Sequence, residues 1–298
     1  DKTRRRRWYP DVFRPAGSGV ATGKELIRLA LFGQPVKSSL SPTIHHAFAD
    51  QFGLDISYQL IETAAESFPP ALEQFRLAGG SGCNITLPLK QEAWRVATQA
   101  SKEVEQAQAA NTLVLQPSSG WFAHTTDGIG FFTDLTRNHQ VALAARRVLV
   151  LGAGGAVAGI LGRLLAGGPQ EVVIVNRNQQ RARNLAERFN TLGNLGVTNW
   201  EELPSSGRFD LVINATSLGH HGEAPPLTAA VFATGAMCYD MNYFKASLPL
   251  KALVESLGFG YMDGLGMLVE QAAESFFIWT GERPDSKTVI DLCRERVA

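Results

Sequence analysis

The sequence predicts an α/β fold divided into two units. From Leu26 onward short apolar runs alternate with segments of helical periodicity, and a glycine-rich turn at residues 152–156 joins one such run to a helical pattern. The chain of 298 residues is about twice as long as a typical domain, which is a second reason to expect two units. Since strands that alternate with helices usually pair in parallel, we expect largely parallel sheets.

The first unit begins with the apolar run over residues 26–33, which is typical of a strand that ends at Gly33. In the helical segment that follows, Ser41 is expected as the N-cap and Pro42 as the first helical residue. The remaining elements expected in this unit are a strand over 56–62, a helix from about Pro70 and a strand from residue 82.

Polar and apolar residues alternate between residues 84 and 90. Asn84, Thr86 and Lys90 fall on one side of this stretch, and Pro88 interrupts it. An exposed edge strand would alternate in the same way, and its proline would discourage pairing with other chains. The pattern alone therefore leaves two interpretations open, an exposed edge and a row of polar groups that bind a ligand.

The second unit is expected to start near Arg146 with a strand, the glycine turn and a helix. Its other expected elements are strands within 171–177, 209–219 and 236–243, a helix over 181–189, a long apolar helix over 263–281 and an amphipathic helix over 285–298. The helices from Gly264 onward are expected to return to the first unit.

Gly152 and Gly154 follow a buried strand and precede a helix, which is the context that a dinucleotide-binding turn requires. Gly152 permits the tight turn, while Gly154 and Gly155 let the backbone approach a pyrophosphate at the helix N-terminus. The third glycine position of the usual fingerprint holds Val157. We expect a Rossmann-type, doubly wound parallel sheet; a glycine turn without a ligand is the alternative.

The residues after the next strand indicate which dinucleotide binds. NAD-binding sheets carry an acidic residue there, which accepts a hydrogen bond from the ribose 2′-hydroxyl. This chain has Asn176 and Arg177 at that place and Arg181 four residues later. Arginine attracts a 2′-phosphate and can bind it with two hydrogen bonds, so we expect NADP rather than NAD. Two ordinary surface arginines are the alternative.

Charge and composition exclude several classes of function. The 28 basic and 28 acidic residues balance, so no overall field favours nucleic acid or an anionic membrane. The basic run Arg4–Arg7 is interpreted as part of a tail over residues 1–24. No run of 18 apolar residues exists, so we expect no membrane span. Neither the histidines nor the three scattered cysteines form a metal-binding pattern, and the cysteines are expected to be reduced, mostly buried thiols of a cytoplasmic protein.

The sequence resembles the shikimate dehydrogenase family from about residue 30 onward. The resemblance rests on nine motifs in the family's order: SSLSP (38–42), GCNITLPLK (82–90), AANT (109–112), TTDG (125–128), GAGGA (152–156), NRNQQR (176–181), NATSLG (214–219), YDMNY (239–243) and DGLGMLVEQAA (263–273). It implies NADP-dependent, reversible reduction of 3-dehydroshikimate to shikimate in aromatic amino-acid biosynthesis. A quinate/shikimate dehydrogenase with relaxed cofactor use and a catalytically silent ligand sensor remain alternatives.

The resemblance also implies roles for single residues. Lys90 matches the family's catalytic lysine, and Asp127 would orient it and bind a neighbouring hydroxyl. The expected substrate contacts are Ser39, Ser41, Asn84, Thr86, Asn111, Tyr243 and Gln271. The expected cofactor contacts are Gly152, Ala153, Gly154, Gly155, Ala156, Asn176, Arg177, Arg181, Thr216, Met241, Gly264 and Met267.

The implied architecture has a substrate-binding domain over 25–127 plus 264–298 and an NADP-binding domain over 128–263. The cleft between the two domains would hold both ligands, and its closure would exclude water. The partner is expected to be a small-molecule substrate, with no nucleic acid, membrane or metal, and the protein is expected to be a monomer or a homodimer.

Overall fold

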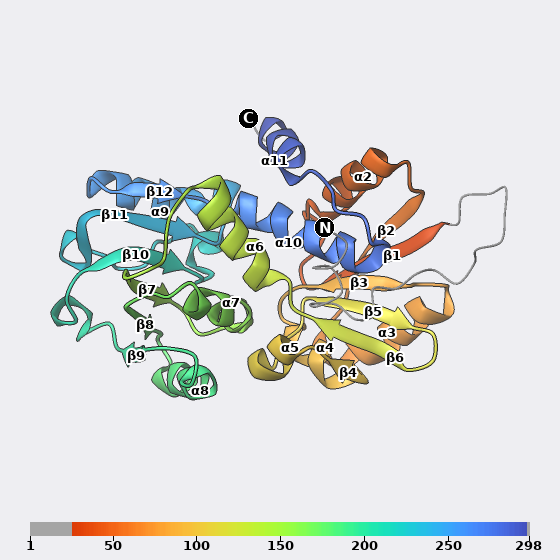
Figure 1. Cartoon of the computed structure of the whole chain (residues 1–298), viewed down its shortest axis with the longest axis horizontal. Coiled ribbons are helices and arrows are strands. Elements are labelled where there is room, and N and C mark those ends of the chain that lie inside the picture. The colour runs from red at the N-terminus through yellow and green to blue at the C-terminus, as the bar shows by residue number, and fades with distance from the viewer. Residues whose placement is uncertain (1–25, 297–298) are drawn as a thin grey trace.

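The computed structural model describes residues 26–296, so the tail expected over residues 1–24 lies outside the described residues. Two six-stranded sheets form the two halves of the molecule. Helices α6 (Asp127–Thr133) and α10 (Leu265–Thr280) run between these halves (Figure 1). The α/β fold with two units that the sequence predicts is confirmed.

The first sheet has the strand order β2-β1-β3-β5-β6-β4. Its strands are β1 (Ile27–Gly33), β2 (Ile56–Glu62), β3 (Gly82–Ile85), β4 (Gln99–Ala100), β5 (Thr112–Gln116) and β6 (Gly120–His124). The helices of this half are α2 (Ser41–Phe52), α3 (Phe68–Leu77), α4 (Lys90–Val96) and α5 (Lys102–Ala107). Strand β1 pairs in parallel with β2 and β3, but β5 is antiparallel to both β3 and β6. The sequence pattern does not predict this antiparallel hairpin.

The second sheet is parallel throughout, with the order β12-β11-β10-β7-β8-β9. Its strands are β7 (Arg147–Leu151), β8 (Glu171–Val175), β9 (Leu195–Thr198), β10 (Phe209–Asn214), β11 (Phe232–Asp240) and β12 (Gly260–Met262). Its helices are α7 (Gly155–Ala166), α8 (Gln179–Phe189) and α9 (Leu248–Ser256). The order reverses between β7 and β10, and ligands of doubly wound sheets bind at the carboxyl ends of such strands.

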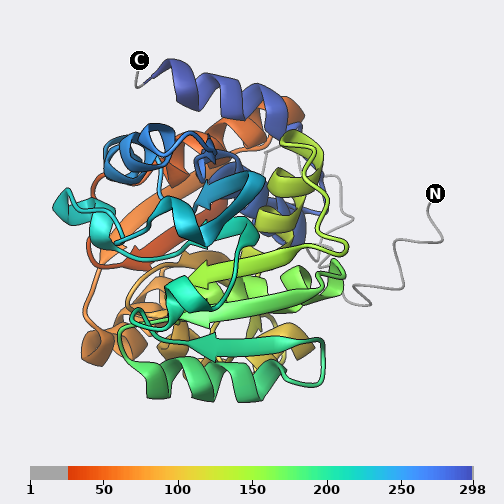
Figure 2. The same cartoon turned by 90° about the vertical axis from the view of Figure 1, so that its left-hand side faces the viewer.

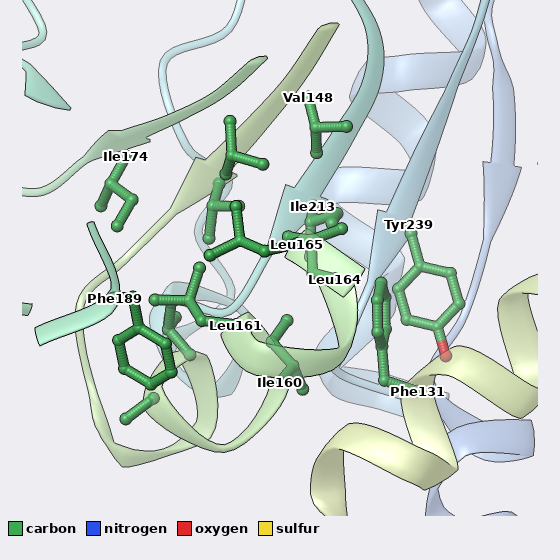
Figure 3. Packing of buried hydrophobic residues seen from close by; sticks show 14 of the residues in the cluster. Phe131, Val148, Ile160, Leu161, Leu164, Leu165, Ile174, Phe189, Ile213 and Tyr239 are labelled. Atoms are coloured by element: carbon green, nitrogen blue, oxygen red, sulfur yellow. The ribbon is translucent and has the colours of Figure 1, made fainter. Parts of the chain in front are cut away.

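Helix α7 buries one face against this sheet. Ile160, Leu161 and Leu164 lie against strand residues such as Val148 (Figure 3). Each of these side chains is fully buried, and burial of one stabilises the fold by about 1.5–3 kcal/mol. This packing fixes the start of α7, and with it the glycine turn, relative to the strands.

Helices α10 and α11 (Ser286–Glu295) belong to the core of the first half. Phe276 and Val289 lie in one buried cluster with Ile44 and Phe48 of α2. In both views α11 lies at the end of the molecule opposite to α8 (Figures 1 and 2). The C-terminal helices therefore do return to the first half, as the sequence suggests.

The structure corrects two details of the sequence interpretation. The N-cap of α2 is Leu40 rather than Ser41, because the backbone at Leu40 is already helical and its carbonyl accepts from the N–H of Ile44. The polar row is also not one strand. Strand β3 ends at Ile85, a turn follows, and Lys90 is the first residue of α4.

Candidate active site

A lysine and a carboxylate from two different helices meet between the two halves of the molecule. Nζ of Lys90, at the start of α4, lies 2.5 Å from Oδ2 of Asp127, at the start of α6. Their side chains are 17% and 8% exposed. The pair is thus shielded from most bulk water, while the ammonium remains partly exposed and keeps two further N–H donors for a ligand.

Asn111 holds the carboxylate from the other side. Its Nδ2 lies 2.9 Å from Oδ1 of Asp127 and 3.1 Å from Oε1 of Gln271. Its Oδ1 accepts from the backbone N–H of Thr126 at 2.8 Å, which fixes the orientation of the amide. Asn111, Asp127 and Gln271, which come from three separate motifs, therefore form one hydrogen-bonded group.

The two serines lie close together at the start of α2. The hydroxyl of Ser39 donates to Oγ of Ser41 at 3.1 Å, and it accepts from the Ser41 backbone N–H at 3.2 Å. Thr86 follows the neighbouring parallel strand β3 and contacts Gly33 at the end of β1, so both motifs lie at the same edge of the first sheet. Tyr243 packs against the cluster that contains α2, and burial raises the pKa of its hydroxyl.

Asn84 occupies a different place from the other expected substrate residues. It is only 5% exposed, and its amide bonds to protein groups on both sides. Its Oδ1 faces Tyr58 and His45, while its Nδ2 faces the backbone carbonyl of Asn111 and the hydroxyls of Thr112 and Ser275. This amide has no hydrogen-bonding capacity left for a ligand.

The glycine turn lies directly beside the lysine. Gly152 has φ +112°, and a Cβ there would lie 3.2 Å from the Ala215 carbonyl, so a side chain is excluded for conformational and steric reasons. A Cβ on Gly155, the first residue of α7, would lie 3.6 Å from the Cβ and Cδ atoms of Lys90. Ala153 and Ala156 complete the turn. The start of α7 and the lysine of the ion pair therefore lie side by side.

The residues after β8 are those for which the sequence predicts contacts with a 2′-phosphate. Arg177 follows the strand and is exposed, and Arg181 is the third residue of α8. The guanidinium of Arg181 approaches Gly154, with Nη2 3.9 Å from the position of an added Cβ. Asn178 caps α8 by accepting from the Arg181 N–H at 3.0 Å, and Asn176 donates to the Asn178 carbonyl.

A pocket of about 370 Å³ lies between the glycine turn, α5 and α8. Besides Arg181 it is lined by Asn184 and Arg188, which sequence reasoning missed. These residues are three and seven positions after Arg181, so helical periodicity places all three on one face of α8 and could have found them. Arg188 also donates to the Ala107 carbonyl at 2.9 Å and so bridges the two halves over this pocket.

Four expected cofactor contacts lie at the ends of the strands on the other side of the second sheet: Thr216 follows β10, Met241 follows β11, Gly264 follows β12, and Met267 is in the first turn of α10. Thr216 donates to the Asn214 side chain, which fixes the loop after β10. Met241 and Met267 both pack against the core cluster of the second half. A Cβ on Gly264 would lie 2.4 Å from the Met241 carbonyl, so only glycine permits this approach of chain segments.

Several further expectations concern groups outside the cleft. Cys83, Cys238 and Cys293 are buried and unbridged among the described residues, as expected. Within residues 26–296, no helix is long and apolar enough to cross a bilayer. The same residues contain no group of three or more His, Cys, Asp or Glu side chains that could hold a metal ion.

Three family models match this chain. The shikimate dehydrogenase substrate binding domain matches residues 31–113, the shikimate / quinate 5-dehydrogenase model matches 134–221, and the shikimate 5'-dehydrogenase C-terminal domain matches 264–294. A curated shikimate dehydrogenase (NADP(+)) from Alkalilimnicola ehrlichii is 46% identical over 268 residues, which cover 90% of this chain and 98% of that protein. The chain belongs to the shikimate dehydrogenase family.

A second curated relative and two solved structures are also similar to this chain over most of its length. A shikimate dehydrogenase (NADP(+)) from Coxiella burnetii is 41% identical over 89% of this chain and 97% of its own length. The structure of the Ael1 enzyme from Pseudomonas putida, 39% identical, superposes with a TM-score of 0.82 over 89% of this chain and 97% of that chain. The Thermus thermophilus shikimate 5-dehydrogenase in complex with NADP(H) and shikimate is 32% identical, with a TM-score of 0.77 over 90% of this chain and 99% of that chain.

Membership of the shikimate dehydrogenase family confirms the resemblance drawn from the nine motifs. The matched ranges include the ion-pair lysine, the glycine turn and the glutamine of α10. The nucleotide-binding interpretation of the second sheet thus agrees with the family, with the topology and with the glycine turn.

Proposed function

We propose that this chain is an NADP-dependent oxidoreductase that reversibly reduces 3-dehydroshikimate to shikimate. The observation that carries the proposal is the Lys90–Asp127 pair, which lies against Gly155 of the nucleotide turn. A proton donor thus lies beside the dinucleotide site, as carbonyl reduction requires. The printed names of the curated relatives and of the Thermus thermophilus complex support the same reaction and cofactor.

The residues of the second half fit NADP. The pyrophosphate would lie at Gly152–Ala156, where the backbone is open and the N-terminus of α7 favours an anion. Arg177 and Arg181 would hold the 2′-phosphate, and no acidic residue stands at the end of β8 to repel it. Asn176 would shape this end of the pocket, whereas Thr216, Met241, Gly264 and Met267 would line the nicotinamide end.

The bound cofactor supplies a hydride to the ring carbonyl carbon. Lys90 would donate a hydrogen bond to the carbonyl oxygen and then transfer a proton to it, so that this oxygen becomes the hydroxyl of the product. In the reverse direction neutral Lys90 accepts this proton. Asp127 orients the ammonium through the 2.5 Å bond and accepts from a ring hydroxyl of the substrate. Asn111 keeps Asp127 in place through its 2.9 Å bond.

The other end of the substrate carries a carboxylate and further hydroxyls. We propose that Ser39 and Ser41 donate to the carboxylate, since their hydroxyls lie side by side at the start of α2. Thr86, Gln271 and Tyr243 supply the remaining polar contacts. Tyr243 stays neutral at physiological pH because burial raises its pKa, so it acts as a hydrogen-bond donor.

The domain assignment is part of this proposal. Residues 25–127 plus 264–298 would form the substrate-binding domain, and residues 128–263 the NADP-binding domain. The division is supported by the sheets, since β1–β6 precede residue 127 and β7–β12 follow it, and by the packing of α10 on α2. We also propose a cytoplasmic enzyme that acts as a monomer or homodimer.

Absorbance at 340 nm tests the function. The purified protein is mixed with shikimate and NADP, then with NAD, and then with quinate in place of shikimate. A rate with shikimate and NADP that exceeds the others supports the proposal. Equal rates with quinate would favour a quinate/shikimate dehydrogenase, and no rate in any mixture would favour a ligand sensor. The intact Lys90–Asp127 pair argues against a sensor, because binding alone needs no proton donor.

A further inference from the structure

A buried layer of polar side chains lies directly beneath the proposed substrate site. It consists of His45 on α2, Tyr58 on β2, Asn84 on β3, Thr112 on β5 and Ser275 on α10. All five are buried, and His45, Thr112 and Ser275 have no exposed surface. A fully connected network of this kind fixes the positions of the elements that contribute to it.

Asn84 is the centre of this layer, and its orientation is determined. The backbone carbonyl of Asn111 can only accept a hydrogen bond, so the Asn84 atom that faces it at 3.3 Å must be Nδ2. Nδ2 also reaches Oγ of Ser275 at 3.0 Å. Oδ1 therefore points to the opposite side, where it accepts from the hydroxyl of Tyr58 at 2.8 Å.

The orientation of Asn84 also determines the protonation of His45. Because Oδ1 of Asn84 can only accept, Nε2 of His45 must carry a hydrogen and donate it over 3.1 Å. Nδ1 of His45 is buried and has no partner among the described residues, so it carries no hydrogen. The ring also stacks on Tyr58, with the ring centroids 4.6 Å apart and an interplanar angle of 11°.

Four of the five members of the layer, all except Tyr58, are close along the chain to a proposed substrate contact; Thr112 directly follows Asn111. His45 is one helical turn after Ser41, and Ser275 is one turn after Gln271. Asn84 is on β3, two residues before Thr86, which directly follows that strand. The layer thus ties together, from below, the separate elements that carry the substrate contacts.

A chain of hydrogen bonds leads from this layer to the ion pair. Nδ2 of Asn84 donates to Oγ of Thr112 at 3.2 Å, and that hydroxyl reaches Oδ1 of Asn111 at 3.0 Å. Asn111 then donates to Asp127, which binds Lys90. Movement of Asn84 would therefore be transmitted to the group that holds the proposed proton donor.

We propose that Asn84, held by His45 and Tyr58, is a positioning residue that aligns Asn111 and Asp127 and does not itself touch the substrate. This inference rests on the proposed function and replaces the expectation of a direct substrate contact. It also assigns a role to His45 and Tyr58, which no sequence motif singles out. The role requires the hydrogen bond from His45, and the bulk of the ring alone does not fulfil it.

Paired substitutions of His45 test the proposal in the full-length protein. His45→Phe keeps the ring and its stacking but removes the donor to Asn84. His45→Gln has an amide nitrogen that can reach the position of Nε2 and donate in its place. We expect His45→Phe to lower kcat for shikimate oxidation about tenfold, the size of one lost buried hydrogen bond, and His45→Gln to stay within about twofold of the wild type. The KM for NADP should change in neither variant, since its pocket belongs to the other sheet.

The outcomes separate the possible failures. An inactive wild-type protein overturns the proposed function, whereas an active wild type with an unimpaired His45→Phe variant overturns the positioning role alone. Equal losses in His45→Phe and His45→Gln overturn it as well, because an amide that restores the donor to Asn84 would then not restore kcat. Tyr58→Phe removes the other donor to Asn84 and should reproduce the loss in kcat. A crystal structure with bound shikimate gives an independent check, because a hydrogen bond from Asn84 to the ligand would contradict the inference.

Discussion

Nζ of Lys90 lies 2.5 Å from Oδ2 of Asp127, and the two residues are the first residues of helices α4 and α6. Removal of the amine should remove the proton donor while the substrate contacts remain. We expect Lys90→Ala to lower turnover about 10²-fold or more, with a smaller change in the KM for shikimate. Steady-state kinetics measure both constants. Lys102→Ala, at the exposed start of α5, is the matched control, and near-normal turnover of Lys90→Ala would exclude the lysine from the chemistry.

Two glycines of α7 should respond in opposite ways to alanine. A Cβ on Gly159 would lie 2.8 Å from Oδ2 of Asp127, so Gly159→Ala must displace the carboxylate and should lower kcat at least tenfold, by the loss of about 1.4 kcal/mol or more. A Cβ on Gly162 meets Phe189 at 3.8 Å, an ordinary contact. Gly162→Ala should keep full activity and stabilise the fold by about 0.5–1 kcal/mol. Kinetics and thermal unfolding of both variants check this, and an active Gly159→Ala would show that Asp127 tolerates displacement.

Cofactor choice should depend on the arginine near the glycine turn. Arg181→Gln removes a charged donor to the 2′-phosphate, and a hydrogen bond of this kind contributes about 1.5–3 kcal/mol. We expect the KM for NADP to rise about 10- to 100-fold and the KM for NAD to stay nearly constant. Arg183→Gln is the control, since Arg183 is on the same helix and donates a hydrogen bond to Gln179 one turn earlier. A parallel rise for NAD would mean that Arg181 binds the pyrophosphate instead.

His45 should make the fold sensitive to acid. Burial lowers its pKa from 6.5 to about 3, with a smaller contribution from the neighbouring His46. Between these pH values the unfolded chain binds a proton that the folded chain does not, so acidification favours unfolding. The free energy of unfolding should fall by about 1.4 kcal/mol per pH unit from this group as the pH drops below 6.5.

Urea unfolding of the wild type and of His45→Gln at several pH values isolates this contribution. The carboxylates titrate in both proteins, so the difference between the two stability curves belongs to the imidazole. The curves should converge as the pH falls from 6.5 toward 3 and run parallel above 6.5. Parallel curves over the whole range would show that the pKa of His45 is the same in the folded and unfolded states, and would contradict its lowering by burial.

The sequence predicts the second half of the molecule better than the first. Strands such as β7 and β8 are short, largely buried and apolar, so each one is recognisable as an apolar run between glycines or polar residues. The glycine turn identifies β7 as the first strand of the nucleotide-binding sheet. Strand β9 (Leu195–Thr198) was missed because it is only four residues long and partly exposed. In the first half, the hairpin of β5 and β6 escaped notice because its turn at 117–119 lacks the usual two-residue glycine signal.

Site residues that belong to short sequence motifs can be predicted from the sequence, whereas roles that depend on long-range packing cannot. Lys90, Asp127 and the two serines are recognisable because their motifs are short and specific. Asn84 matches a motif equally well, but its bonding partners come from four other segments, and no local pattern reveals that its amide is fully used. Strand alternation likewise predicts that Lys90 continues the polar row of Asn84 and Thr86. In the structure a turn precedes α4, and Lys90 lies beside Gly155 of the glycine turn.

The contribution of α10 and α11 to the core around Ile44 and Phe48 has a consequence for biosynthesis. When residues 26–126 have emerged from the ribosome, the helices that cover α2 have not yet been synthesised. The apolar face of α2 therefore stays exposed to solvent until synthesis is nearly complete. The cluster that includes Leu149, Val212 and Val254 is contiguous in sequence and can condense earlier. In chains stalled near residue 263, we expect protease to digest the N-terminal portion before the segment from Arg147 to Met262.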